Sequence, residues 1–279
     1  MNEQFRVAHK LGLMFHHDTP LPEDVKAWAI SQLHNKSPAL GIKRIRLYPK
    51  HKVQEWPKSL QPDLKKRDDM FAVYKQNVRK QRMELEGHTS EAAKRANEVD
   101  NLMGEKDEVK FAHRNIYGKD QVRLRFTSFW ANHFTTGNIW DNQNHIGHAI
   151  DEAILANLNG SFSHMLYKMT THPSMLVYLD NVWSSGENSK NAIEARKEGR
   201  IEGLNDNLGR ELLELHSVSP AAKYSETDIR NAASVLAGWG IWPGNISDGL
   251  MTLDERHKKL IKMGETTNSW DFFKKWHAE

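Results

Sequence analysis

The stretch from Asp120 to Trp239 constrains the fold most, because its apolar side chains recur at helical spacing and its helix boundaries are clearly marked. No segment shows sustained alternation of apolar and polar residues, and β-branched residues are few. We therefore expect an all-α, bundle-like assembly of several helices with little or no β structure.

Capping and spacing signals locate the expected helices. Segment 224–239 is the clearest, because Ser225 is followed three residues later by Asp228, which is the spacing of a capping box. Segment 183–203 has no apolar period and is long for a structural connection, so we expect a functional or mobile loop there. The other expected helices span 21–33, 120–134, 145–158, 161–173 and 205–218, with a short helical turn at 174–180.

The N-terminal part differs in character from the rest. Residues 35–62 contain four prolines and predict a long irregular arm, whereas residues 63–114 are highly charged and predict a pair of long surface helices. We therefore divide the chain into a charged helical region, 1–107, and a helical core, 108–279.

Basic residues are concentrated in this N-terminal region. Between residues 36 and 82, fourteen Lys or Arg stand against four Asp or Glu. Such a block can contact nucleic acid, but aromatic residues for base stacking are sparse within it. We interpret it as a solvated surface and do not expect nucleic-acid binding.

The composition excludes several classes of protein. There is no cysteine, so disulfides and cysteine-ligated metal sites cannot form. The patterns GxGxxG, GxxxxGK, GxSxG and HExxH are absent, so we expect no cofactor and no metal. No apolar run is long enough for a membrane helix, and no signal-peptide cleavage site is recognisable, which favours a cytoplasmic protein without membrane insertion.

One face of segment 205–218 concentrates polar and ionisable groups. On an α-helical wheel Asn207, Arg210, Glu211 and Glu214 fall together. Two carboxylates at i and i+3 can share a proton, hold a cation or be pinned by Arg210. The alternative is that this face simply points to solvent. A separate face carries the leucines Leu208, Leu212 and Leu215.

His133 is the second candidate for chemistry. It shares a helix face with Phe126, Phe129 and Trp130, so it should be buried or line a cleft. A histidine on an apolar face is often a core residue without a chemical role, and this alternative stays open. His216 faces away from the two carboxylates on the α-helical wheel, so no site formed by two glutamates and a histidine is expected for a metal.

Five motifs occur in the order and spacing of a known bacterial family: FWANHF (129–134), THPSMLVYLDN (171–181), GENS (186–189), LNDNLGRELLELHSV (204–218) and YSETDIRNAASVLAGW (224–239). In these motifs the chain resembles the domain of unknown function 1800 family, from about residue 108 to the end. The resemblance implies no assigned activity. It implies export as the alternative to a cytoplasmic location, and a sulfatase-like protein encoded nearby as an expected partner.

The resemblance also concerns the C-terminus. Family members usually continue after the last tryptophan motif through a His-Glu-Pro-Gly-like turn into a further helical region. This sequence ends at WHAE, so we expect the C-terminal part of the family domain to be lacking.

Together these features predict a polar cleft between segments 120–134 and 205–218, covered by 183–203. For an enzyme we expect hydrolysis of a polar polymer or glycan, with Glu211 or Glu214 as general acid or base and His133 assisting proton transfer. The alternative is a non-catalytic structural or interaction module, whose polar side chains form a buried network that locks the helices together. The residues expected to bind substrate, some of them through the resemblance alone, are Asn132, Arg210, Asn207, Asn188, His172 and Asp180.

Overall fold

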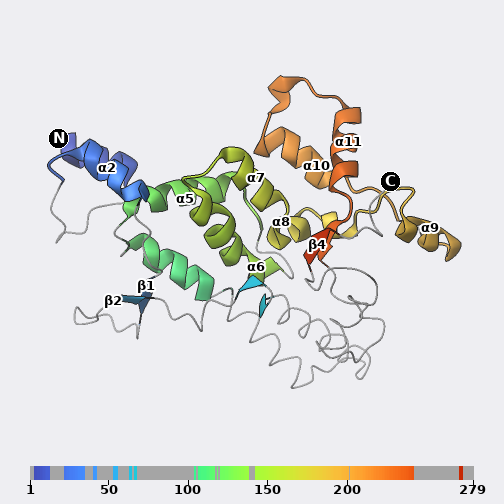
Figure 1. Ribbon diagram of the computed structural model, residues 1–279, viewed down its shortest axis with the longest axis horizontal. Helices are drawn as coiled ribbons and strands as arrows, with labels where there is room; N and C mark the ends of the chain where they lie inside the picture. The colour runs from blue at the N-terminus through green and yellow to red at the C-terminus, as the bar shows by residue number, and fades with distance from the viewer. Residues whose placement is uncertain are drawn as a thin grey trace, which may run out of the picture.

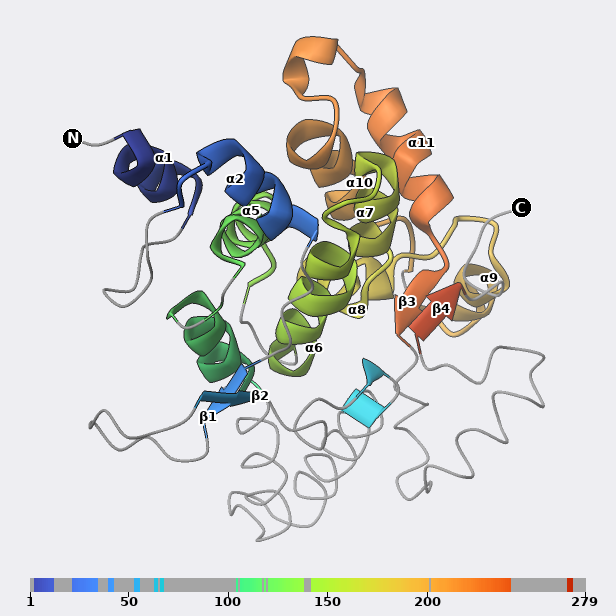
Figure 2. The ribbon, with the colours of Figure 1, turned by 60° about the vertical axis from the view of Figure 1, so that its left-hand side comes forward.

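The computed structural model of the protein is built almost entirely of helices, as the sequence predicts (Figure 1). Helices α5 to α8 occupy the middle, α1 and α2 lie at one side, and α10 and α11 project together at another (Figures 1 and 2). The structure describes residues 3–12, 22–34, 40–42, 53–55, 63, 64, 66, 67, 104, 106–116, 118, 120–137, 142–200, 202–241 and 270–272.

Two N-terminal helices, α1 (Glu3–Leu11) and α2 (Val25–His34), pack against α5 (Gln121–His133). The side chain of Asp24 accepts a hydrogen bond from the backbone N–H of Ala27, which caps the start of α2. The helices expected at 21–33 and 120–134 are therefore confirmed, with the first beginning after Pro22 rather than at it.

Strands are few and short in the described part of the chain. β1 (Leu40–Ile42) pairs antiparallel with β2 (Val53–Glu55), and β3 (Trp239–Ile241) pairs antiparallel with β4 (Trp270–Phe272). The first pair lies within the arm expected to be irregular, and the rest of that arm falls outside the described residues. The expectation of little β structure is confirmed.

One continuous helical run consists of α6 (Gln143–His148), the π-helix η3 (Ala149–Ile154) and the 3₁₀ turn η4 (Leu155–Asn157). It confirms the helix expected at 145–158. A π-helix bonds residues five apart instead of four, and such turns occur often at functional sites.

Two further helices complete the centre of the fold, α7 (Phe162–Thr170) and α8 (Pro173–Tyr178). The Ser161 hydroxyl caps α7, and the His172 imidazole accepts from the backbone N–H of Ser174 at the start of α8. The main apolar core lies between these helices, α5 and η3. Its buried members are Phe134, Ala149, Ala153, Ile154, Met165, Met169, Met175, Leu176, Leu208 and Leu236.

The segment expected as a loop, 183–203, instead contains a helix. The 3₁₀ turn η5 (Asn181–Trp183) ends at the first residue of this segment, and the helix that follows within it is α9 (Lys190–Lys197). Ser189 caps this helix, and Ala192 and Ala195 are its buried residues. Alanines supply little hydrophobic signal, so the helix was missed although its cap is a good one.

The last described helices form an antiparallel pair. α10 (Asn207–Glu211) passes directly into the π-helix η6 (Leu212–His216), and after the 3₁₀ turn η7 (Pro220–Ala222) the chain returns as α11 (Glu226–Leu236). The predicted capping box of Ser225 and Asp228 is present at the start of α11. The two helices lie side by side in both views (Figures 1 and 2).

Residues 106–116 are helical but are not the surface helix that was expected. Asp107, Lys110 and Arg114 are buried, and so is Arg67 from the basic block. The surface interpretation is wrong for these four residues, and most of the remaining residues of 36–103 lie outside the described part. The division of the chain at residue 107 stays a prediction, and the helical residues 106–116 run across it.

Candidate functional site

His133, at the end of α5, is held by a backbone carbonyl. Its Nε2 atom lies 3.2 Å from the carbonyl oxygen of His216. A carbonyl oxygen only accepts hydrogen bonds, so Nε2 carries a proton, and Nδ1 is the acceptor nitrogen in the neutral form of the ring. The contact therefore gives His133 one basic nitrogen in a defined orientation.

Aromatic rings surround His133 at the protein surface. Phe129 stacks on the imidazole with ring centroids 6.4 Å apart and an interplanar angle of 12°, and the Phe162 ring lies 6.3 Å away. Phe129 is 58% exposed and Phe162 is 41% exposed. Phe126 is exposed as well, because α5 buries Val122 and Leu124 instead. We call the following residues the His133 face: Phe129, Trp130, His133, Phe162 and His216.

The π-helical turn of η6 changes which residues share a side of the helix. Because a π-helix bonds residues five apart, His216 follows Glu211 by one turn. An α-helical wheel places Leu215 with the apolar leucines, but this side chain is 60% exposed. His216, the next residue, is buried instead. The α-helical wheel that separates His216 from Glu211 therefore does not describe this turn.

His216 is buried as a neutral group. Burial, and after it the charge of His133, lower the pKa of His216 to about 4. Among the described residues its Nδ1 atom has no hydrogen-bond partner. This imidazole is therefore a weak base whose backbone carbonyl, rather than its ring, orients His133.

Glu211 and Glu214 are half-buried and form no hydrogen bond or ion pair within the described part of the chain. Both act on Tyr224, whose pKa is raised by burial and then by the negative charge of Glu214 and Glu211. As far as the described residues are concerned, the two carboxylates are thus available to a ligand. Arg210 does not pin them, because it donates to Glu226 at 2.9 and 3.1 Å and to Asp206 at 3.1 Å.

The structure does not bring the other expected site residues to this face as a group. Asn132, Asn188 and Asp180 are exposed, and Asp180 has a left-handed φ of 56°. Asn207 is exposed, and its backbone N–H donates to the side chain of Asn205. His172 is buried in a different part of the molecule.

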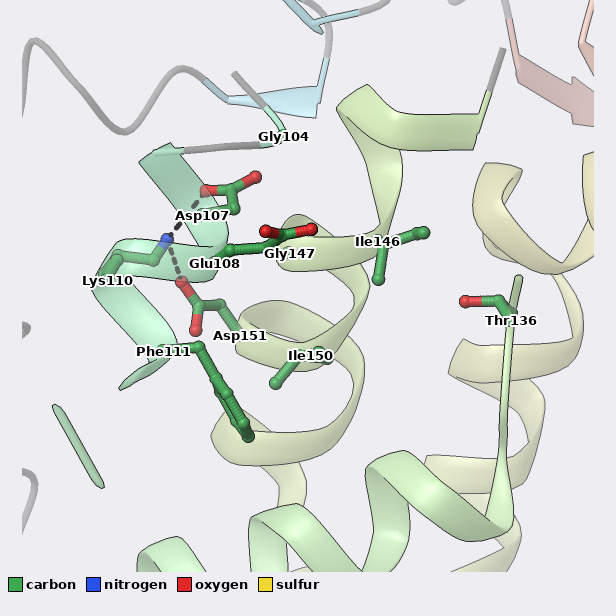
Figure 3. A pocket seen from close by; sticks show the side chains of 10 residues that line it. All are labelled: Gly104, Asp107, Glu108, Lys110, Phe111, Thr136, Ile146, Gly147, Ile150 and Asp151. Atoms are coloured by element: carbon green, nitrogen blue, oxygen red, sulfur yellow. Dashed lines mark hydrogen bonds and ion pairs between the residues drawn. The ribbon is translucent and has the colours of Figure 1, made fainter. Parts of the chain in front are cut away.

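A second group of ionisable side chains, not expected from the sequence, lies between residues 106–116 and the α6–η3 run. Asp107 accepts from Arg67 at 2.5 and 3.0 Å and from Lys110 at 3.2 Å. Lys110 also donates to Asp151 at 2.6 Å (Figure 3). Arg114 donates to Asp151 at 2.7 Å. The buried charge cluster is formed by Arg67, Asp107, Lys110, Arg114 and Asp151.

The cations of the buried charge cluster stabilise the ionised form of Asp151. Burial alone would raise the pKa of Asp151, but the charges and hydrogen bonds of Arg114 and Lys110 outweigh it and hold that pKa below its ordinary value. Buried charges are stable only when they are paired in this way. The cluster therefore joins residues 106–116 to η3 through ion pairs.

Three histidines lie beside this cluster. Nδ1 of His172 accepts from the Ser174 N–H, so its Nε2 carries the proton and donates to Nδ1 of His148 at 3.1 Å. Burial is the main cause that lowers the pKa of His145 to about 3 and of His148 to about 4, and Arg67 lowers both further. Burial, followed by the charge of His148, also holds the pKa of His172 well below its usual value. All three are therefore neutral at physiological pH.

The described residues contain no group of three or more potential ligands arranged to hold a metal ion. Among the described helices, none combines the length and the apolarity needed to cross a membrane.

A family model described as a protein of unknown function, DUF1800, matches residues 17–276. The chain belongs to the DUF1800 family. The match begins far before residue 108, so most of the charged N-terminal region belongs to the DUF1800 domain together with the core motifs. No curated protein and no solved structure matches the chain.

The sequence of this DUF1800 chain does carry a signal for the buried charge cluster. Asp107, Lys110 and Arg114 are spaced by three and four residues, which places them on one helix face. Their partners Arg67 and Asp151 are 40 residues before Asp107 and 37 residues after Arg114. The periodicity of the sequence can thus place Asp107, Lys110 and Arg114 on one helix face, whereas the burial of these side chains depends on partners far away in the sequence.

Proposed function

We propose that this DUF1800 protein hydrolyses a polar polymer, with glycans as the preferred class, at the His133 face. The observation that carries the proposal is the hydrogen bond from His133 Nε2 to the carbonyl of His216, which leaves Nδ1 as the basic atom. Exposed aromatic rings beside it offer apolar area on which the face of a sugar ring can stack. The half-buried Glu211 and Glu214 have no competing partners among the described residues.

In the proposed reaction, Nδ1 of His133 takes a proton from a water molecule, whose oxygen attacks the anomeric carbon. The glycosidic C–O bond breaks, and the leaving oxygen receives a proton from the carboxyl group of Glu211 or Glu214. Solvent then returns the proton from the imidazole to the carboxylate. The net result is the addition of one water across the bond.

The test is the release of new reducing ends from purified peptidoglycan, chitin, starch and hyaluronan. We expect turnover on at least one polymer, and a loss of at least about a hundredfold in kcat for His133→Gln and for Glu211→Gln or Glu214→Gln. Because the two carboxylates have no described partners, their variants should change the free energy of unfolding by less than about 0.5 kcal/mol.

Glu194→Gln is the matched control, because Glu194 is an exposed acid on α9. It should keep wild-type turnover. Absence of turnover on all four polymers, or full activity of the His133→Gln variant, would contradict the proposal.

The second candidate function is a non-catalytic module, and the buried charge cluster favours it. Its charges are paired with one another and join separate elements, as expected for side chains that lock helices together. In such a module the exposed rings of the His133 face would bind a partner protein, and the sulfatase-like protein suggested by the family resemblance is the partner to try. Phe129→Ala would then abolish co-purification, while no polymer would be cleaved.

A further inference from the structure

A cavity of about 210 Å³ lies against the buried charge cluster, and none of the residues described in its lining belongs to the His133 face. One wall is formed by residues 106–116 and the other by α6 and η3 (Figure 3). Phe111, Ile146 and Ile150 supply most of its apolar lining. A side chain at Gly147 would collide with Asp107, so the glycine allows the two walls to approach beside the cavity.

The hydrogen-bonding groups that line the cavity are mostly acceptors. Asp107 already accepts three hydrogen bonds and Asp151 accepts two, so each carboxylate has lone pairs to spare. Lys110 has one N–H left after donating to both of them. Thr136 keeps its hydroxyl hydrogen while accepting from Ser174 at 2.9 Å. A ligand that fits this lining must therefore bring donors.

The negative charge of Glu108 favours a ligand with a positive charge. It is exposed at the cavity, and it forms no hydrogen bond or ion pair with the described residues. In Figure 3 its carboxylate extends from the 106–116 helix toward the turn that carries Gly147. The other charged residues described in the lining, Asp107, Lys110 and Asp151, are engaged with one another or with Arg67 and Arg114.

From these contacts we infer that the cavity binds a small organic ammonium ion, with Glu108 as its counter-ion. The ammonium group supplies three donors to an acceptor-rich lining, and a short aliphatic chain packs on Phe111, Ile146 and Ile150. Small-molecule sites commonly occupy about 300–1,000 Å³, so this smaller cavity suits a ligand of only a few carbons.

The test titrates the full chain with n-butylammonium, n-butanol and butyrate, three probes of similar shape and different charge, followed by saturation-transfer NMR. We expect the ammonium ion to bind, with a dissociation constant that rises with salt. Butanol should bind more weakly and butyrate should not bind. Equal or tighter binding of butanol or butyrate, or no binding of the ammonium ion, overturns the inference.

Two variants and one control locate the binding. Glu108→Gln keeps the size of the side chain and removes its charge, so butylammonium should bind about fivefold more weakly, as for a partly exposed ion pair. Ile146→Trp fills the cavity and should abolish binding. Glu152→Gln, an exposed acid on η3 that does not line the cavity, should bind as the wild type does. Unchanged affinity in Glu108→Gln or in Ile146→Trp overturns the assignment.

Discussion

Asp107 is the residue on which the pairing of the buried cations depends. It is 4% exposed, and its carboxylate accepts from both Arg67 and Lys110. Lys110 has Asp151 as a second carboxylate, and Arg67 also donates to the carbonyl of Asn144. Removing the Asp107 charge would therefore take away the carboxylate that accepts two hydrogen bonds from the buried guanidinium of Arg67.

We expect Asp107→Asn to lower the free energy of unfolding by about 3–5 kcal/mol, because removal of one partner of a buried ion pair is strongly destabilising. Urea denaturation followed by circular dichroism measures this value. Glu187→Gln is the control, since Glu187 pairs with Arg230 on the surface and its loss should change stability by less than about 1 kcal/mol. A similar small effect for both variants would show that the cluster is solvated.

At the scale of single residues, sequence reasoning found the candidates but not their surroundings. His133 was selected by its place on a helix face, and its contact with His216 depends on a carbonyl 83 residues away. Asp107, Lys110 and Arg114 were assigned to a surface helix because charged residues are seldom buried. Their pairing with Arg67 and Asp151 is a tertiary contact that local composition does not encode.

At the scale of elements, the α10–η6–α11 pair shows which local features are predictable. The capping box of Ser225 and Asp228 is confirmed because it involves only neighbouring residues. The π-helical turn at Leu212–His216 was not predicted, since the same side chains suit an α-helix and packing selects between the two. The helix α9 was missed because its buried side chains are alanines.

The close approach of α10 and α11 depends on Gly209. A Cβ atom at this position would lie 2.8 Å from the backbone nitrogen of Ala233 and 3.0 Å from the carbonyl oxygen of Ile229. We expect Gly209→Ala to lower the free energy of unfolding by about 1–3 kcal/mol, because backbone atoms cannot yield as a flexible side chain can.

Thermal and urea denaturation of Gly209→Ala are best compared with those of Gly203→Ala. A Cβ atom at Gly203 would meet nothing within 4 Å, so this control should lie within about 0.5 kcal/mol of the wild type. If the two variants were equally stable, the helices would not pack as closely as the structure shows.

At the scale of the whole molecule, four neutral histidines of the described residues make stability dependent on pH: His145, His172 and His216 are buried, and His148 is half-buried. The pKa of His145 is lowered to about 3 and those of His148 and His216 to about 4, chiefly by burial, and that of His172 is also lowered. The ordinary pKa of histidine is about 6.5. The unfolded chain therefore binds more protons than the folded chain between pH 6.5 and pH 4.

We expect the free energy of unfolding to be greatest above about pH 6.5 and to fall as pH decreases toward 4, by up to about 1.4 kcal/mol per pH unit for each such histidine. Urea titrations over this range give the slope. His148→Gln should reduce this slope by about the contribution of one bound proton. His164→Gln, a substitution at an exposed histidine, should leave the slope unchanged. A wild-type slope near zero would show that these imidazoles are accessible to water.

The fold class of the whole molecule was predictable, because helical periodicity and caps recur through most of the core. The arrangement of the helices was not, because it depends on long-range pairs such as Arg67 with Asn144, which are 77 residues apart. The proposed chemistry rests on the His133 face, which sequence motifs indicated and the geometry of His133 and His216 makes specific.

The methionines of the core give this cysteine-free chain a vulnerability to oxidants. Met165, Met169 and Met175 are at most 3% exposed, so peroxide reaches their thioethers only when the surrounding helices open. Conversion to the sulfoxide places a polar group in the apolar core and prevents the helices from closing again as before. The rate at which these three side chains gain oxygen, read by peptide mass spectrometry, therefore reports how often the centre of the fold opens.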